Sequence, residues 1–486
     1  EELGEEAEAA AAADGSAPVP PQSSVEFEAR VLANRSLCTE AHAREEQDVR
    51  NVRLLATSGA SYEAGDVCVV WPRLEASLVR RFVVETLGRG LRERVVVRPV
   101  RRGRGAGGGA AVSIFPEAPL TLEEIFTSYV DISAVPPRHF FHVLSQHTED
   151  EVHRTKLREF ASRTLEAKDA LYEYCKRERR SAAEVMWDFW TARPPLAELL
   201  GALPPMRPRR YSIASCPRWH AACPASASAA RFLLDYREAC GPAWRPRLRG
   251  RAAEAACAER MEKLRRDGRM EKACVLDLCV GVVTFTTRTG REGRGLCSGF
   301  LERSEVGASV RCGFERGSLA LPPLEVPLIL ICPGTGLSPC RALVQERHLE
   351  VARRGGGSAA AGGRFVAGMK DLMFLGFRHQ EGDFLYEGEW SVHSPWLDVH
   401  IAFSRDHEDR KVYVQDLIEE QGAHVCRLLD AGARVFVCGR SHPMPSQVFD
   451  SLTEVLETHR GLSSDAAAAR LRGMQRAQQY ICDTWG

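Results

Sequence analysis

The stretch VPLILICPGTGLSPCRALVQER, residues 326–347, decides the fold of the second half of the chain. An apolar run of strand type leads into the turn Pro333, Gly334, Thr335 and Gly336, and a helical pattern follows directly. Such a turn points backbone N–H groups and the positive end of a helix toward a phosphate. Taken alone, the turn would also fit a tight strand-to-helix connection that needs a positive φ. The stretch therefore predicts a nucleotide-phosphate cradle only if other motifs support it.

The sequence around this turn repeats the alternation of strand and helix. Short apolar runs, LEVPLILICPGTG, DLMFLGFRH, WLDVHIAFS and ARVFVCGRS, alternate with helical stretches from about residue 325 onward. This alternation is typical of a doubly wound parallel sheet. We therefore expect a parallel-sheet domain over residues 321–486.

In the first half of the chain, the spacing of apolar residues differs from that of the second half. Short β-rich runs such as VEFEARVLA and AGDVCVVWP predict barrel strands over residues 26–118, and β-rich sequence returns over residues 206–320. Between them, residues 119–205 carry apolar side chains at helical spacing. The predicted fold is multidomain, α+β and α/β: an antiparallel β-barrel interrupted by a helical insert, followed by the parallel-sheet domain.

Other segments are expected to carry no chemistry. Residues 1–25 are acidic, Ala-rich and then Pro/Ser-rich, which predicts a disordered linker. Surface insertions are expected at residues 101–109, 217–270 and 353–363.

Composition excludes several classes of function. The 65 basic residues balance 65 acidic ones, which argues against a nucleic-acid-binding protein. The 16 cysteines contain no C-x-x-C pair, so we expect no metal site, and a reducing compartment fits best. No apolar run reaches the roughly 18 residues of a membrane span, and a secretory signal pattern is missing. We expect a cytoplasmic protein without a membrane segment.

Three motifs in order support the phosphate cradle. RRYSIAS at residues 209–215, GLCS at 295–298 and PGTG at 333–336 resemble the signature of the ferredoxin-NADP reductase superfamily. The later segments GFR at 376–378 and VCG at 437–439 look like nicotinamide-domain motifs of the same group. The helical insert is similar to the diflavin branch of that superfamily. Within this branch, the chain most resembles the NADPH-dependent diflavin oxidoreductases that serve cytosolic iron–sulfur cluster assembly, in EYCKRERR, SRDHEDRKVYVQ and the ending DTWG.

The resemblance implies an FAD site in the barrel. Arg209 offers a guanidinium fork suited to a pyrophosphate, and the ring of Tyr211 can stack on a flavin. Ser212 would lie near the flavin atom that receives the hydride. Arg179 matches a further flavin contact, although Arg177 and Arg180 leave its register open. The implied FAD-binding residues are Arg179, Arg209, Arg210, Tyr211, Ser212, Gly295, Leu296, Cys297, Ser298 and Trp485.

The resemblance also implies an NADPH site in the parallel-sheet domain. Because NADPH differs from NADH by one 2′-phosphate, selectivity requires a cationic pocket beside the ribose. Arg405 and Lys411 would supply the charge, with Arg410 at the offset that the family pattern leads us to expect. The implied NADPH-binding residues are Gly334, Thr335, Gly336, Ser404, Arg405, Lys411, Val412, Tyr413, Val414 and Gln415.

Four residues are implied in hydride transfer: Ser212, Cys438, Asp483 and Trp485. Without the resemblance, Cys438 would more often be a plain core residue. Trp485 is expected to cover the flavin face. Arg440 and Gln447 depart from the family pattern and put one nicotinamide-ribose contact in doubt.

The implied activity is hydride transfer from NADPH to FAD, followed by release of electrons one at a time. These residues contain no flavodoxin-like sequence, so we expect an FMN-binding flavodoxin-like domain upstream, and an anamorsin-like iron–sulfur protein as acceptor. Three alternatives stay open: the reductase half of another diflavin enzyme of the microsomal cytochrome reductase type, a stand-alone ferredoxin-NADP-type reductase, and a cofactor-free scaffold. The helical insert argues against the stand-alone reductase.

Overall fold

The barrel is built from strands of both halves of the first domain. The computed structural model describes residues 26–56, 59–98, 114–222, 274–354, 369–407 and 409–485. Among these residues, six strands pair in the order β6-β3-β10-β1-β2-β7. A bridge between Ile213 and Leu278 joins the two edges, so the sheet closes on itself. The strands are β1 (Phe27–Ser36), β2 (Val49–Ala56), β3 (Val67–Trp71), β6 (Arg209–Ser212), β7 (Cys274–Gly281) and β10 (Ser309–Glu315).

Among the described residues, three helices and a hairpin attach to this barrel. The hairpin β8 (Thr284–Thr286) and β9 (Glu292–Arg294) leads from β7 toward the helical part. The helices are α2 (Glu40–Glu45), α10 (Pro217–Ala222) and α13 (Leu296–Arg303). α10 falls in the predicted insertion 217–270, but His220 on this helix is buried and lies 3.4 Å from Asp277 of β7. The prediction is therefore wrong for residues 217–222, and residues 223–270 lie outside the described part.

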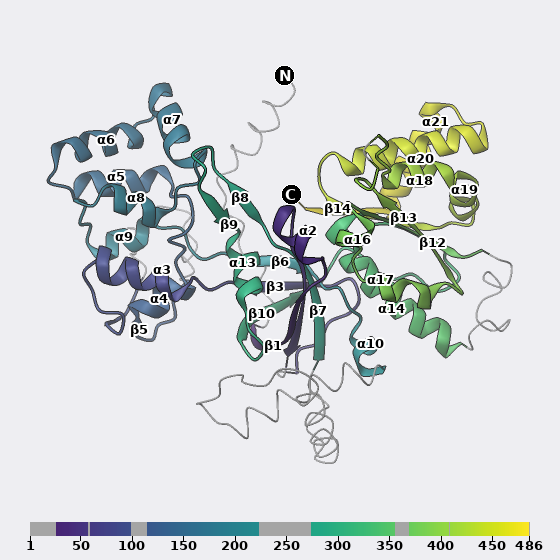
Figure 1. Cartoon of the computed structure of the whole chain (residues 1–486), viewed down its shortest axis with the longest axis horizontal. Helices are drawn as coiled ribbons and strands as arrows, with labels where there is room; N and C mark the ends of the chain where they lie inside the picture. Colours follow the sequence, from purple (N-terminus) through teal and green to yellow (C-terminus); the bar gives the residue numbers. More distant parts are fainter. Residues whose placement is uncertain are drawn as a thin grey trace, which may run out of the picture.

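The helical part forms its own core beside the barrel (Figure 1). It contains α3 (Ala76–Arg80), η1 (Arg81–Thr86), α4 (Leu122–Ser128), α5 (Arg138–Gln146), α6 (Glu151–Ala161), α7 (Leu165–Leu171), η2 (Tyr172–Lys176), α8 (Ala182–Asp188) and α9 (Leu196–Ala202), with the short pair β4 (Arg94–Val95) and β5 (Leu120–Thr121). We expected barrel sequence as far as residue 118, and this is wrong for residues 76–86. The apolar residues of that stretch recur at helical spacing, and Phe82 packs on Phe126 with ring centroids 5.2 Å apart.

The second half of the chain forms the doubly wound sheet. In the described residues its strand order is β13-β12-β11-β14-β15, and all neighbours are parallel. The order reverses between β11 and β14, which creates the crevice where such sheets bind ligands. The strands are β11 (Leu328–Ile331), β12 (Asp371–Phe377), β13 (Leu397–Phe403), β14 (Arg434–Arg440) and β15 (Tyr480–Trp485).

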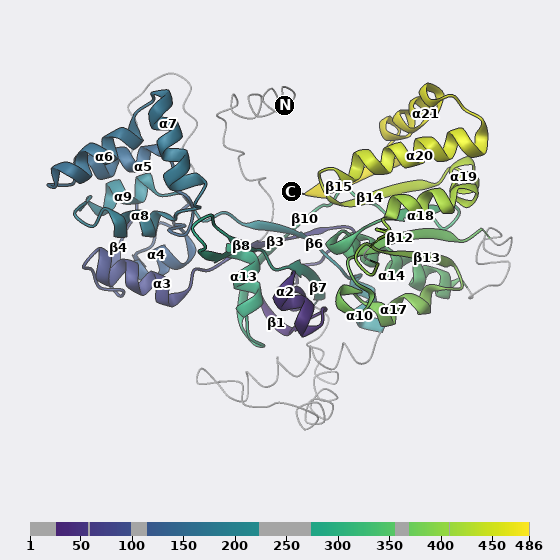
Figure 2. The same ribbon diagram turned by 45° about the horizontal axis from the view of Figure 1, so that its top comes forward.

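Helices cover both faces of this sheet (Figures 1 and 2). Leu328 and Leu330 of β11 pack on the face of α14 (Leu337–Arg353), and Ile329 and Ile331 pack on the opposite face. All four side chains are fully buried, as expected for a central parallel strand. The remaining elements are η4 (Gly334–Gly336), α16 (Gln380–Asp383), α17 (Glu387–Trp390), η6 (Ser391–His393), α18 (Val414–Glu420), α19 (Gly422–Asp430), α20 (Met444–Arg460) and α21 (Ser464–Arg476).

The three parts lie in a row. Both views show the barrel between the helical part and the parallel sheet. The predicted linker 1–25 and insertion 101–109 lie outside the described residues, as do residues 355–363 of the insertion predicted at 353–363.

Candidate functional site

The PGTG turn sits at the crevice between β11 and β14. Gly334 has φ +58°, a conformation that L side chains rarely adopt. A Cβ on Gly336 would collide with the carbonyl of Cys438, so only glycine permits this approach. η4 continues directly into α14. The Gly336 N–H donates to the Pro333 carbonyl at 3.1 Å, the Leu337 N–H donates to the Gly334 carbonyl, and Pro339 has no N–H. The turn therefore places Gly334, Thr335 and the positive end of a helix at the crevice where nucleotides bind in this class of sheet.

A buried thiol pair lies behind the turn. The Sγ atoms of Cys340 on α14 and Cys438 on β14 are 3.6 Å apart. This contact, together with burial, raises the pKa of Cys438 well above its ordinary value. Cys438 is therefore a protonated thiol at neutral pH. The sequence analysis did not anticipate the partner Cys340, because buried cysteines carry no pattern that reveals which of them meet.

Asp483 stands beside Cys438 on the neighbouring strand. The two residues are register partners in the parallel pairing of β14 and β15. Burial raises the pKa of Asp483, although a hydrogen bond with Ser318 opposes that shift. The structure thus brings the predicted residues Cys438 and Asp483 together as two groups whose protons are held more tightly than usual.

The two predicted flavin motifs meet inside the barrel. Tyr211 on β6 packs against the barrel core that contains Cys297, which lies in the first turn of α13. Burial raises the pKa of Tyr211, and it raises the pKa of Cys297 to about 12. β6 and α13 are 85 residues apart in sequence, counted from Ser212 to Cys297. Their contact joins the aromatic ring and the helix start in one place.

The neighbours of Tyr211 on β6 have different surroundings. Arg209 is exposed, and its Nη1 donates to the carbonyl of Arg207 at 2.8 Å. Its guanidinium pairs with no described carboxylate, so most of its donors are available for a pyrophosphate. Arg210 is committed, because its Nε donates to Glu315 Oε2 at 2.7 Å on β10. Arg210 is thus engaged in an ion pair on the barrel surface, and its predicted contact with the cofactor stays a prediction.

Ser212 continues β6 opposite Val67 of β3. It is half-buried, and its hydroxyl makes no hydrogen bond to a described group. The next residues then leave the strand and close the barrel. Ser212 is thus a free hydroxyl at the end of the strand that carries Tyr211.

The GLCS motif begins α13. Gly295 is the N-cap residue, and a Cβ there would lie 2.8 Å from Ser298 Oγ and 2.9 Å from Val283 Cβ. Ser298 Oγ accepts a hydrogen bond from the Val283 N–H at 3.1 Å. Ser298 therefore fixes the start of α13 against the segment after β7. The N–H groups of Leu296 and Cys297 remain without intrahelical partners and could hold a phosphate.

Arg179 joins the helical part to the β8–β9 hairpin. It has a positive φ of 46°, and its guanidinium lies 4.3 Å from the ring centroid of Phe285. Arg177 pairs instead with Glu173, and Arg180 with Asp188. Of the three arginines, Arg179 is therefore the one directed at the hairpin, and its flavin contact stays a prediction.

The predicted 2′-phosphate residues follow the carboxyl end of β13. Ser404 Oγ donates to the carbonyl of Phe377 at 3.3 Å, and the Arg405 N–H donates to the carbonyl of Arg378 at 2.8 Å. Neither Arg410 nor Lys411 pairs with a described carboxylate, so the choice between them stays open.

The start of α18 supplies the other predicted contacts of this loop. Val412 precedes Tyr413, whose side chain is 48% exposed and could offer its ring to adenine. Val414 is buried beside Gly376, where an added Cβ would lie 3.1 Å from Val414 Cγ1. Gln415 Nε2 donates to Gln447 Oε1 at 2.9 Å. Gln447, which departs from the family pattern, thus has a defined contact within this loop.

A buried polar network joins the parallel-sheet domain to the barrel. Arg341 on α14 donates to the carbonyl of Ala214, two residues after Ser212, and lies 3.4 Å from Asp277 Oδ2. Asp277 is fully buried and also accepts from Arg53 at 2.7 Å. Although burial opposes ionisation, the His220 and Arg53 contacts keep the pKa of Asp277 well below its ordinary value. Sequence reasoning missed this network, because its members are far apart along the chain.

The C-terminal residues form a strand. β15 pairs with β14, and the Trp485 carbonyl accepts from the Ser441 N–H at 2.9 Å. The Trp485 side chain is 40% exposed. Both views show β15 ending toward the barrel. The backbone around Trp485 is therefore anchored while its indole is free to contact a ligand.

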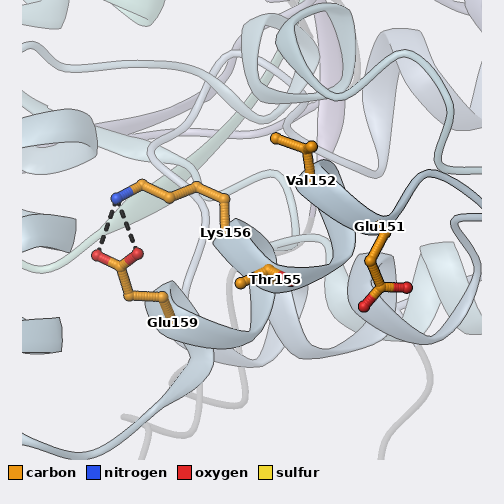
Figure 3. A pocket seen from close by; sticks show the side chains of 5 residues that line it. All are labelled: Glu151, Val152, Thr155, Lys156 and Glu159. Carbon is orange, nitrogen blue, oxygen red and sulfur yellow. Dashed lines mark hydrogen bonds and ion pairs between the residues drawn. The ribbon is translucent and has the colours of Figure 1, made fainter.

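One surface hollow lies away from these residues. It has a volume of about 380 Å³ and is lined by Glu151, Val152, Thr155, Lys156 and Glu159, all on α6 (Figure 3). Lys156 and Glu159 form an ion pair across it, with Nζ and Oε1 2.8 Å apart. Since one helix face supplies the whole lining, this hollow offers no converging groups for a substrate.

The described residues fit FAD and a nicotinamide nucleotide. Gly336 and Gly295 let the two helix starts pack closely on Cys438 and Val283, and Arg209 keeps unused donors for a pyrophosphate. Within the described ranges, no cluster of His, Cys, Asp and Glu could hold a metal ion. None of the helices in that part of the chain is long and apolar enough to span a membrane.

Comparison with known proteins gives consistent results. The family described as "FAD binding domain" matches residues 20–223, and the family described as "Oxidoreductase NAD-binding domain" matches residues 330–448. NADPH-dependent diflavin oxidoreductase 1 of Bos taurus is 30% identical over 96% of this chain and 66% of its own length. The Arabidopsis thaliana protein of the same name is 28% identical over 91% of this chain and 62% of its own. The chain thus spans somewhat less than two thirds of the length of these relatives.

Proposed function

Because the chain belongs to the NADPH-dependent diflavin oxidoreductase family and carries its FAD- and NADP-binding domains, we propose that it is the module that oxidises NADPH. The single observation that carries this proposal is that α14 connects the PGTG turn with the residues that follow β6, the strand of the predicted flavin contacts. α14 begins at the PGTG turn, and Arg341 on its second turn holds the carbonyl of Ala214 just beyond Tyr211 and Ser212. One helix would therefore fix the two predicted cofactor sites relative to each other.

Residues of β6 and α13 would hold the flavin. Bound FAD would accept a hydride from NADPH and release electrons singly. Tyr211 would stack on the flavin, and Arg209 with the first-turn amides of α13 would hold its pyrophosphate. The Ser212 hydroxyl can donate a hydrogen bond at the end of β6.

On the nucleotide side, Gly334 to Gly336 would hold the pyrophosphate, and Arg405 the 2′-phosphate. Cys438 and Asp483 lie side by side at the ends of β14 and β15. The raised pKa of the Cys438 thiol keeps this group neutral beside the place where the nicotinamide would lie, and burial raises the pKa of the neighbouring Asp483 carboxyl. Trp485 would cover the flavin until the nicotinamide displaces it.

The onward path of the electrons is a proposal from family resemblance. We infer that the electrons pass to an FMN-binding flavodoxin-like domain and then to an anamorsin-like iron–sulfur protein, in cytosolic iron–sulfur cluster assembly. The likeness to the diflavin oxidoreductases over 96% of the chain supports the first step. The separate helical core, which a single-flavin reductase would not need, favours the diflavin type.

The flavin content of the purified chain and its reduction of electron acceptors test the proposed function directly. We expect a yellow protein that contains FAD and that reduces ferricyanide with NADPH. Without an FMN domain it should hardly reduce a large haem-protein acceptor, and adding a separate FMN domain should restore that reaction. Efficient haem-protein reduction without the added domain would contradict the assignment as a half-reductase. A colourless preparation that cannot be reconstituted with FAD would favour the cofactor-free scaffold.

A further inference from the structure

Glu46 reaches from the barrel domain into the nucleotide loop of the parallel-sheet domain. It is the residue that follows α2, and its side chain is only 19% exposed. Its Oε2 lies 2.6 Å from Arg405 Nη1 and 2.8 Å from Arg378 Nη1. Its Oε1 lies 3.1 Å from His379 Nε2. One carboxylate thus gathers the cation predicted for the 2′-phosphate and two further basic groups.

The Glu46 carboxylate is ionised at neutral pH. Burial opposes ionisation, but the hydrogen bond with His379 and the charges of Arg405 and Arg378 outweigh it. The pKa of Glu46 therefore lies below its ordinary value. The anion faces the guanidinium groups that a phosphate would need.

The other carboxylates nearby are engaged differently. Asp383 accepts from the backbone N–H groups of Arg378 and His379, at 3.0 and 2.7 Å. Asp406 accepts from the Gln380 N–H at 3.2 Å, and its Oδ1 lies 3.3 Å from His379 Nδ1. Among the described residues, Glu46 is therefore the carboxylate that pairs with the Arg378 and Arg405 guanidinium groups.

The position of Glu46 does not depend on its own contacts. The Thr39 N–H at the start of α2 donates to the carbonyl of Gly382 at 3.0 Å. His42 of α2 lies 3.7 Å from Asp383, and a Cβ on Gly382 would lie 2.8 Å from His42 Nδ1. The segment is thus held against the nucleotide loop by contacts of Thr39 and His42, and an isosteric change at Glu46 should leave it in place.

We propose that Glu46 is an internal competitor for the 2′-phosphate of NADPH, and so a specificity-determining residue that lowers the preference for NADPH over NADH. This inference rests on the proposed function, because it takes the loop at Arg405 as the 2′-phosphate site. A phosphate needs the N–H donors that Glu46 now occupies, or it must bind beside the carboxylate and be repelled by it. In either case the glutamate weakens binding of the 2′-phosphate and leaves the rest of the nucleotide unaffected.

Binding of two small nucleotides to the full chain tests this without any turnover. The probes are 2′,5′-ADP, which carries the 2′-phosphate, and 5′-AMP, which lacks it, both titrated calorimetrically at one low ionic strength. Glu46→Gln should bind 2′,5′-ADP about fivefold or more tightly than the parent, because one repelling charge within contact distance is gone. Affinity for 5′-AMP should stay the same, and added salt should shrink the gain.

Glu45→Gln is the matched control. Glu45 is exposed, lies one residue earlier and forms no ion pair with a described group, so this change removes the same net charge without the contact. It should leave both affinities unchanged. Glu46→Ala provides a second variant and should shift 2′,5′-ADP binding in the same direction as Glu46→Gln.

Two outcomes would overturn the inference in distinguishable ways. If the parent binds 2′,5′-ADP and the Glu46 variants bind it equally or more weakly, Glu46 orients the arginines and does not compete with the phosphate. If the parent and all variants fail to prefer 2′,5′-ADP over 5′-AMP, the NADPH site itself is misplaced, and the inference falls with it.

Discussion

Arg405 is the residue at which nucleotide selectivity can be measured most simply. It is the second residue after β13, and its backbone is fixed by the bond to the Arg378 carbonyl. Arg405→Ala should remove charge-assisted hydrogen bonds and weaken NADPH binding by about 1.5–3 kcal/mol. NADH lacks the 2′-phosphate and should bind nearly as before. Titrations with both nucleotides provide the comparison, and equal losses for both would contradict the assignment.

His393 provides a test of stability against pH. Burial, with the neighbouring His348 and Arg341, lowers the pKa of His393 to about 4. The unfolded chain binds a proton at this histidine below a pKa of about 6.5, whereas the folded chain does so only below about 4. The free energy of unfolding is therefore unaffected by this proton above about pH 6.5 and falls as the pH drops toward 4. Between about pH 7 and pH 5 the parent should therefore lose about 2 kcal/mol through this residue.

Urea unfolding of His393→Gln and the parent at both pH values measures this difference. The variant should lose correspondingly less free energy of unfolding on acidification. His139→Gln, at an exposed position in the helical part, should follow the parent. A His393→Gln chain with the full pH dependence of the parent would show that the residue is not held neutral.

At the scale of the element, α14 connects the nucleotide cradle with the flavin strand. Replacing Arg341 with Met leaves the buried Asp277 with one cation fewer and the Ala214 carbonyl without its donor. We expect Arg341→Met to lower the free energy of unfolding by about 3 kcal/mol or more. Arg353→Met, near the exposed end of the same helix, removes only a surface pair with Glu350 and should cost less than about 1 kcal/mol. Similar losses in both variants would mean that the Arg341 network adds little.

β15 makes the role of Trp485 testable, because the strand is held by backbone pairing and not by the indole. If the indole covers the flavin, the nicotinamide must displace it, and productive binding is reduced by the fraction of time that it is in place. Trp485→Ala should then narrow the gap between NADPH and NADH turnover and change the flavin fluorescence.

Trp190→Ala is the control for Trp485→Ala, because it removes a 64% exposed indole from the helical part. It should change neither the gap between NADPH and NADH turnover nor the flavin fluorescence. If Trp485→Ala also keeps the nucleotide preference and the flavin fluorescence of the parent, the indole does not lie on the flavin.

At the scale of the whole molecule, sequence reasoning succeeded where a function depends on local pattern. The PGTG turn, the parallel strands around it and the split of the barrel by helices all follow from residues that are neighbours in the chain. The start of the helical part was missed, because residues 76–86 carry a helical period within a stretch bounded by strand sequence. Contacts between domains could not be predicted, since Glu46 and Arg405 are brought together only by the docking of two cores.

The central claim is that this chain binds FAD and reduces it with NADPH. The absorbance of the flavin tests this claim directly. FAD-loaded chain is mixed anaerobically with NADPH or with NADH, and the absorbance of the oxidised flavin is followed. The structure predicts rapid loss of that absorbance with NADPH and a much slower loss with NADH. FAD-loaded chain whose flavin absorbance is unchanged by NADPH would contradict the claim.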